Sequence, residues 1–367
     1  MLSERETLCY LLTKGLITSE VAVRAGVRVE DASRRNRNFK VICASGPSYL
    51  VKQGIGIQGT DTIAHEGAVY TYLHANGGAP YLPACFGFDD DRKILILELM
   101  QGAQDFRQYH ARRGIFGPTI AGQLGLLLGL LHAKNPAGNL RRSSAPFLAD
   151  QPPWILSIAR PPSVVLREIS DANLTLVRAI QQSSELPALL ESLRQEWRTE
   201  TLIHHDIKWD NCIVHTEIVG GKAKRLKIID WEGASIGDPC WDVGSVFSNY
   251  LSFWLFSNPD LGDGAPEQFL ESARYPLETM HNAIGTFWRT YASAMGLQRA
   301  DSHERLLRAT RYAAARLIQT GYEYLAVTPH FTRAIAFLLQ LSANVMKRPQ
   351  EAIAHLLGIP LEAIPAR

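Results

Sequence analysis

The stretch "TLIHHDIKWDNCIVH", residues 201–215, concentrates titratable and hydrogen-bonding side chains between apolar residues. His204 precedes Asp206 by two positions, and Asn211 follows that aspartate by five. Nineteen residues after Asn211, the apolar run "LKII" ends in Asp230. The spacing H-x-D-x-x-x-x-N, followed by an apolar strand that ends in aspartate, is typical of sites that transfer phosphoryl groups.

Phosphoryl transfer requires these residue types for a physical reason. A carboxylate must orient the incoming hydroxyl and accept its proton, and Asp206 can do so. Magnesium binds carboxylate and amide oxygens, which Asp230 and Asn211 supply. His204 is expected to support the loop through hydrogen bonds. So short a motif also occurs by chance in polar loops, and it is the strand-borne Asp230 that favours the catalytic interpretation.

A lysine and a glutamate upstream fit the same chemistry. "SYLVKQ" places Lys52 inside a strand pattern, where a cation is unfavourable unless it is paired or holds phosphates. Glu66 follows fourteen residues later on the apolar face of a predicted helix. Taken alone, a solvated lysine and a solvated glutamate would be the simpler interpretation. Together with Asp206, Asn211 and Asp230, a Lys52–Glu66 pair is favoured.

The elements that must position these residues change character along the chain. Residues 3–32 are predicted to form two short helices. "NFKVICASGPSYLVKQG" and "ACFGFDDDRKILILELMQG" predict two β-hairpins, before and after the helix that carries Glu66. The chain beyond Gly102 is mostly helical, with a Pro- and Ser-rich excursion at 140–165. The predicted domains are a helical extension (1–37), a small lobe (38–101) and a large helical lobe that carries the catalytic loop and the acceptor-binding helices (102–367).

Composition excludes several classes of protein. With 367 residues, 46% hydrophobic and 20% charged, the chain is ordinary for a globular protein. Its formal net charge of +2 indicates neither a nucleic-acid partner nor an anionic membrane. Five cysteines without a CxxC pair suit reduced thiols. No signal-peptide pattern and no apolar run of membrane-spanning length appears, so a cytoplasmic location is expected.

The motifs resemble a known family. "HHDIKWDNCIVH" is similar to the catalytic loop of the aminoglycoside phosphotransferase and choline kinase-like (APH) family, and "IIDWEGASIGDPCWDVGSVFSNYL" to its metal-aspartate segment. The resemblance covers roughly residues 38–255. It implies an α+β, bilobal protein-kinase-like fold, with a small antiparallel β-sheet plus helix in the N-lobe and a large, mainly helical C-lobe. It also implies a kinase that uses ATP and Mg²⁺ and has an alcohol group as acceptor.

The resemblance assigns further residues. It implies that Asp238 and Asp242 are structural residues that hydrogen-bond the catalytic loop, although Asp238 followed by proline also suits a helix N-cap. It makes "LELMQG" the hinge, where the backbone C=O of Glu98 and N–H of Met100 would meet the adenine edge.

Only seven residues separate Asp230 from Asp238, which leaves no room for the activation loop of a protein kinase.

One departure from the kinase pattern concerns the phosphate-covering loop. The first hairpin lacks G-x-G-x-x-G and has "SRRNRNFKV" instead. The side chains of Arg37 and Asn38, with Arg34 and Arg35, would cover the phosphates, or the segment is a solvated basic turn. Both interpretations stay open.

The phosphate acceptor is less clearly indicated. Residues 251–367 carry eleven Lys/Arg and ten Asp/Glu, which disfavours a polycationic aminoglycoside. A choline site needs an aromatic cage. The candidate aromatics have helical spacing, which is more often a sign of core packing: Tyr250, Phe253, Trp254, Phe256, Phe287, Trp288 and Tyr291.

Two further possibilities remain. The N-terminal helices and "GPSYLVKQ" are similar to APH-like enzymes of RiPP biosynthesis, in class V lanthipeptide and thioamitide pathways. Those enzymes phosphorylate Ser or Thr of a precursor peptide so that a partner lyase can eliminate the phosphate. A nucleotide-binding pseudokinase or scaffold is the alternative without chemistry, and the intact Lys52, Glu66, Asp206, Asn211 and Asp230 disfavour it.

Overall fold

The computed structural model describes residues 1–33, 36–142, 150–161, 169–215, 225–258, 272–328 and 330–360. The chain divides into two compact units. Unit 1 comprises Met1–Tyr109 and Asp210–Ala234, and unit 2 comprises His110–Trp209 and Ser235–Arg367. This division reflects contacts in space, and each unit combines two segments that are distant in the sequence. It does not test the predicted domain boundaries at 37/38 and 101/102, which stay predictions.

Unit 1 is built on an antiparallel sheet with the strand order β1-β2-β3-β5-β4. Its strands are β1 (Val27–Asp31), β2 (Arg37–Cys43), β3 (Tyr49–Gln53), β4 (Cys85–Asp89) and β5 (Ile94–Glu98). Pairing of β2 with β3 and of β4 with β5 confirms both predicted hairpins. A second sheet joins β6 (Gln104–Asp105), β8 (Cys212–His215) and β9 (Arg225–Ile228) in that order.

The prediction of helices throughout residues 3–32 is wrong at its C-terminal end. Helix α1 spans Glu4–Thr13 and begins with a capping box in which Ser3 and Glu6 cap each other's backbone N–H groups. A π-helical segment follows, η1 (Val21–Gly26), and the chain then forms strand β1. The valines of β1 alternate with charged residues over only five positions, and the strand forms by pairing with β2. So short a pattern does not distinguish strand from helix.

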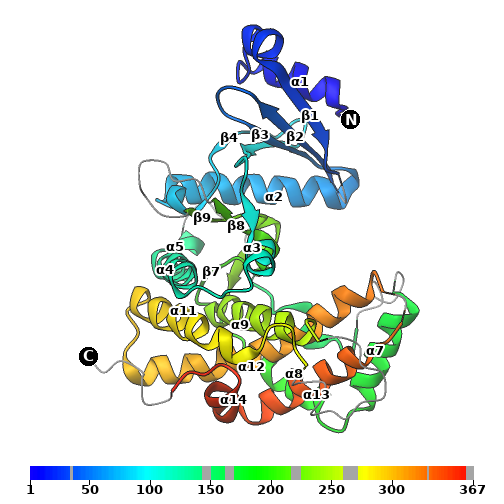
Figure 1. Cartoon of the computed structure of the whole chain (residues 1–367), viewed down its shortest axis with the longest axis vertical. Coiled ribbons are helices and arrows are strands. Elements are labelled where there is room, and N and C mark those ends of the chain that lie inside the picture. Colours follow the sequence, from blue (N-terminus) through cyan, green and yellow to red (C-terminus); the bar gives the residue numbers. More distant parts are fainter. Residues whose placement is uncertain are drawn as a thin grey trace. The chain divides into compact units, whose positions relative to one another are not determined.

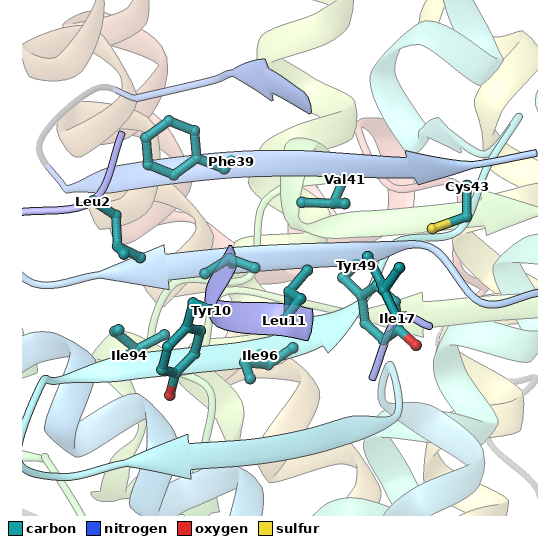
Figure 2. Packing of buried hydrophobic residues seen from close by; sticks show 11 residues of the cluster. Leu2, Tyr10, Leu11, Ile17, Phe39, Val41, Cys43, Tyr49, Ile94 and Ile96 are labelled. Carbon is teal, nitrogen blue, oxygen red and sulfur yellow. The ribbon is translucent and has the colours of Figure 1, made fainter. Parts of the chain in front are cut away.

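Side chains along β3 point alternately to the two faces of the sheet, so the two faces differ in composition. Tyr49, Val51 and Gln53 are buried on one face, and Leu50 and Lys52 point to the other. Residues of the N-terminal segment cover the first face. Figure 2 shows this cluster of buried side chains, which comprises Leu2, Tyr10, Leu11, Ile17, Phe39, Val41, Cys43, Tyr49, Val51, Ile94 and Ile96.

Helix α2 (Gly56–Ala75) contacts β3, β4 and β5 and lies along the sheet of unit 1 (Figure 1). The helix begins where Gly56 adopts φ 64°, a left-handed conformation that glycine takes without strain. Glu66 is fully buried on this helix. The two faces of the sheet therefore differ, with an apolar cluster on the α1 side and the Lys52 side chain on the α2 side.

Unit 2 is mainly helical. Helix α4 (Pro118–Lys134) packs along α11 (His281–Ala294), and α9 (Pro239–Leu255) packs on α12 (Arg299–Leu325) (Figure 1). At Gly125 an added Cβ would lie 2.3 Å from the carbonyl oxygen of Phe287, so the α4–α11 approach requires glycine there. The other α-helices in the described part of the chain are α3 (Phe106–Arg113), α5 (Ala137–Arg142), α7 (Asp171–Gln182), α8 (Leu186–Gln195), α13 (Arg333–Lys347) and α14 (Pro349–His355).

A two-stranded sheet in unit 2 positions the predicted catalytic loop. Strand β7 (Thr201–Ile203) pairs antiparallel with β10 (Ser235–Gly237), and α9 begins directly after β10. The loop leaves β7 at Ile203, which pairs with Ser235 at the start of β10, and the His204 N–H that follows lies 2.7 Å from Asp242 in the first turn of α9. Among the described helices, none combines the length and the apolar character needed to cross a membrane.

Candidate active site

A lysine between two carboxylates is the polar centre of unit 1. Lys52 Nζ lies 2.9 and 2.8 Å from the two carboxylate oxygens of Glu66, and 2.9 Å from Oδ1 of Asp230. The Lys52 side chain is 11% exposed and that of Glu66 is fully buried. Burial alone would lower the pKa of Lys52, but the charges of Glu66 and Asp230 hold it above the ordinary lysine value. The structure therefore contains the predicted Lys52–Glu66 pair.

Asn211 and Asp230 lie at the same end of the β8–β9 hairpin. Asn211 directly precedes β8, Asp230 follows β9 by two residues, and the Ile229 N–H donates to the Asn211 carbonyl at 2.9 Å. Asp230 adopts a left-handed conformation with φ 67°, which is uncommon outside glycine and recurs at functional sites. The backbone contact therefore places Asn211 beside the segment that carries Asp230.

Unit 1 contains a cavity of about 670 Å³. Lys52, Asn211 and Asp230 line it, together with the backbone segment 98–103 that contains the predicted hinge residues Glu98 and Met100. The Glu98 carboxylate accepts a hydrogen bond from the Ala84 N–H at 3.0 Å, which holds the end of β5 to the start of β4. The cavity falls within the usual range of about 300–1,000 Å³ for small-molecule sites.

Arg37 and Asn38, which were predicted either to cover the phosphates or to belong to a solvated basic turn, are the first two residues of β2, and both interpretations stay predictions. Arg37 Nη1 lies 3.3 Å from Asp31 Oδ2, and Asn38 lies opposite Lys52 in the β2–β3 register. Neither belongs to the described lining of the cavity, and Arg34 and Arg35 lie outside the described residues.

The charged lining of the cavity also includes five residues that the sequence analysis did not single out: Arg28, Glu30, Lys40, Asp105 and Asp210. A signal for Lys40 existed, because the alternation along β2 places Lys40 on the face opposite Phe39 and Val41.

In unit 2, Asp206 is held by two cations. Arg316 Nη2 donates to Asp206 Oδ1 at 2.6 Å, and Lys208 Nζ lies 2.8 Å from Asp206 Oδ2. Burial alone would raise the pKa of the Asp206 carboxyl, but the Arg316 and Lys208 charges hold it below its ordinary value. Asp206 is therefore ionised at neutral pH and able to accept a hydrogen bond or a proton.

A buried aspartate on α9 supports the loop that carries Asp206. The Asp242 carboxylate accepts hydrogen bonds from the backbone N–H groups of His204 at 2.7 Å and His205 at 3.0 Å, and His132 Nε2 lies 3.2 Å away. His204 Nδ1 in turn accepts the Asp206 N–H at 3.3 Å. His205 has φ 72°, so the loop is bent sharply at this point. His204 and Asp242 thus hold the backbone on both sides of the bend.

Asp238 has a separate set of contacts. Its carboxylate accepts the Cys240 N–H at 2.9 Å, which confirms the N-cap interpretation, with Pro239 in the first turn. Its other oxygen lies 3.0 Å from Arg308 Nε and 3.3 Å from the Tyr312 hydroxyl. These contacts join the start of α9 to α12.

The aromatic residues considered for a choline cage are mostly core residues. Tyr250 and Phe287 are fully buried, and Phe256 is half-buried and stacks on Tyr324 with ring centroids 5.0 Å apart. The others are buried as well: Phe253, Trp254, Trp288 and Tyr291. The core interpretation is confirmed for these six buried residues.

Comparisons with known proteins point to one family and one fold. The profile of the phosphotransferase enzyme family matches residues 29–275, more than half of the chain. Acyl-CoA dehydrogenase family member 10 of Mus musculus is 26% identical over an alignment of 149 residues, which covers 39% of this chain. The chain spans only 13% of the length of that relative.

Solved structures of two kinases share the fold at low identity. Choline kinase LicA from Streptococcus pneumoniae is 18% identical, covers 94% of this chain and 99% of its own, and has a TM-score of 0.52. Amicoumacin kinase hAmiN, solved with AMP-PNP, Ca²⁺ and Ami, is 12% identical, covers 99% and 100%, and has a TM-score of 0.55. The predicted α+β, protein-kinase-like fold is confirmed.

Proposed function

We propose that this chain, which belongs to the phosphotransferase enzyme family, moves the γ-phosphate of ATP to a hydroxyl group of its acceptor. The observation that carries the proposal is the Lys52 ammonium, held between Glu66 and Asp230 at the wall of a cavity of nucleotide size. A cation held in this way is ready to meet phosphate oxygens without rearrangement of the sheet.

The nucleotide would lie in the cavity of unit 1. The backbone C=O of Glu98 and N–H of Met100 would meet the adenine edge, and Lys52 would contact the phosphates. Leu50 from β3 and Ile213 and Ile229 from the β8–β9 hairpin also line the cavity and supply apolar surface for the base.

The residues present in unit 1 suit magnesium. Asn211 and Asp230 offer oxygen donors only, and both line the cavity. Across the described residues, no three side chains of His, Cys, Asp or Glu gather as a metal cluster. Phosphate oxygens and water would therefore complete the coordination, as Mg²⁺ usually prefers in kinase sites. When bound, Mg²⁺ neutralises the charge that develops on the transferred group.

Asp206 is proposed to orient the acceptor hydroxyl and to accept its proton. Phosphoryl transfer passes through a loose transition state, so the positioning of the hydroxyl contributes more than the strength of the base. An aspartate whose pKa is held low by Arg316 and Lys208 is a weak base with a fixed orientation, which suits this role. His204 and Asp242 are proposed to act only through the backbone of the loop.

The acceptor is proposed to be a hydroxyl-bearing small molecule or a Ser or Thr of a biosynthetic precursor peptide, whose phosphate a partner lyase would eliminate. Two observations support a neutral acceptor over a polycation or a choline-type alcohol. Residues 251–367 are close to charge balance, and the candidate cage aromatics are mainly buried in the core. Choline and amicoumacin kinases share the fold, so the fold itself does not select the acceptor.

A mass-spectrometric assay tests the proposal. The chain is incubated with MgATP and separate panels of aminoglycosides, choline-like alcohols, neutral alcohols and Ser/Thr peptides. Products are monitored for a gain of about 80 Da, the mass of an added HPO₃. Asp206→Asn is the matched control for enzymatic transfer. Binding of MgATP without any product in any panel, and without ADP formation, would identify a pseudokinase and overturn the proposal.

A further inference from the structure

The partners of the two Asp206 oxygens differ in rigidity. Arg316 contacts Oδ1 with a side chain that is only 3% exposed, and its second nitrogen donates to Glu323 Oε1 at 3.1 Å. Gln319, one turn before Glu323, donates to the same Glu323 oxygen at 3.0 Å. Lys208 contacts Oδ2 with a side chain that is 32% exposed. One oxygen is thus held by a buried, doubly anchored arginine and the other by a half-exposed lysine.

From this asymmetry we infer that Arg316 is a positioning residue for the transfer reaction. Arg316 fixes the orientation and charge of Asp206, and the acceptor hydroxyl replaces Lys208 at Oδ2. The inference rests on the proposed function of Asp206 as the group that receives this hydroxyl. Arginine suits the task because its planar guanidinium can bind two carboxylates in a fixed geometry. Lysine has a flexible stem and exchanges partners more readily.

The place of Arg316 in the fold supports this role. Helix α12 has 27 residues and packs on α9, the helix whose Asp242 holds the backbone of the catalytic loop. Two neighbouring helices of unit 2 therefore hold the loop: α9 binds its backbone, and α12 binds the Asp206 carboxylate. A salt bridge that merely attached the loop to α12 would not need to end on the proposed catalytic carboxylate.

The charged groups around Asp206 determine how its pKa should change when one of them is removed. Arg316 and Lys208 contact the carboxylate, His204 lies next to it on the loop, and Glu323 lies on the far side of Arg316. Removing the Arg316 charge should make Asp206 easier to protonate. Removing the Glu323 charge should make Asp206 harder to protonate, because a nearby negative charge that opposes ionisation of Asp206 would be gone.

Kinetics of two Arg316 variants and one control test the inference. Arg316→Gln should lower kcat by a factor on the order of 10², the cost of a misplaced reacting group. Its KM for MgATP should be unchanged. Arg316→Lys should restore the positive charge beside Asp206 but recover only part of the loss in kcat, because lysine lacks the planar guanidinium that fixes the carboxylate. Arg311→Gln is the matched control, since Arg311 lies on the same helix and its described ion pair is with Glu196, at 2.6 Å. It should behave as the parent does.

The assay uses MgATP with water as the acceptor, so that ADP release is measured without knowledge of the natural substrate. The acid limb of kcat/KM against pH should move to higher pH in Arg316→Gln, return in Arg316→Lys, and move to lower pH in Glu323→Gln. Glu323 is 43% exposed, so this third variant should fold even if Arg316→Gln does not.

A measurement without turnover separates this inference from the proposed function. Carbon-13 NMR of protein labelled at the aspartate carboxyl carbons gives the titration of Asp206, identified by its loss in Asp206→Asn. The midpoint should rise in Arg316→Gln and fall in Glu323→Gln. Midpoints and acid limbs that do not move would overturn the inference even for an active kinase. Shifted midpoints in a protein without kinase activity would overturn the proposed function instead.

Discussion

Replacing Lys52 with methionine should destabilise unit 1 and weaken its affinity for phosphates. The variant leaves Glu66 fully buried and Asp230 33% exposed, both without their cation. Removing one partner of a buried ion pair costs about 3–5 kcal/mol. We expect the lower end, about 3 kcal/mol, because Asp230 is partly solvated and Glu66 can take up a proton. This corresponds to a decrease in Tm of about 6–12 °C.

A second variant isolates the electrostatic cause. In Lys52→Met/Glu66→Met the buried carboxylate is removed together with its cation, and the apolar side chains have similar length. Replacing a buried ion pair in this way is often neutral or stabilising, so the double variant should come within about 1 kcal/mol of the parent. Lys14→Met serves as a surface control, since Lys14 is 48% exposed and lies 3.4 Å from Asp89. It should change stability by less than about 0.5 kcal/mol.

Denaturant unfolding at pH 7 measures the free energies, and calorimetric titration measures binding of MgATP and of adenosine. Lys52→Met should lose affinity for MgATP and retain affinity for adenosine, because the lysine is proposed to contact phosphates only. A double variant as unstable as the single one would refute the electrostatic reasoning. Equal loss of both ligands would show that the substitution had damaged the fold, and the phosphate role would remain unsupported.

Three further outcomes are expected. Asp230→Ala should abolish magnesium-dependent ATP binding in a calorimetric titration, and an unchanged affinity would place the metal elsewhere. Asp206→Asn should retain nucleotide affinity and lower kcat by a factor on the order of 10² to 10⁴, so equal turnover would exclude it as the base. Burial alone would raise the pKa of Asp242, but hydrogen bonds from His132 and from the His204 backbone hold it below its ordinary value. The Asp242 carboxylate therefore stabilises the folded protein above the pKa of an unfolded aspartate, and this stabilisation is lost as pH falls through the folded pKa. Asp242→Asn should therefore flatten the acid side of a stability-against-pH curve measured by thermal unfolding.

Features with a local cause could be predicted from the sequence. The alternation of β2 and β3 and the turn between β4 and β5 are signals within a few residues, and both hairpins are present. Lys52 and Glu66 could be paired because each occupies the expected position of its own element, a strand and the helix that follows it. The proline after Asp238 indicated the helix N-cap by the same local logic.

Features that depend on distant partners could not be predicted. Strand β1 is too short to specify itself and is formed by pairing with β2. Arg28 and Glu30 reach the lining of the cavity through that strand, so the error in β1 also concealed them. Arg316 is one of many arginines on helix-forming segments, and only the packing of α12 brings it to Asp206, 110 residues away along the chain.

The two proposed catalytic carboxylates are each neutralised within their own unit. Asp230 meets Lys52, which is 178 residues away in sequence but belongs to the same unit, and Asp206 meets Arg316 and Lys208 in the other. Each carboxylate therefore contacts a cation of its own compact unit, whatever the placement of the two units. Domain closure in kinases changes the distance between the lobes, and electrostatic energies change steeply with distance. Because both ion pairs are internal to one unit, neither depends on the distance between the units.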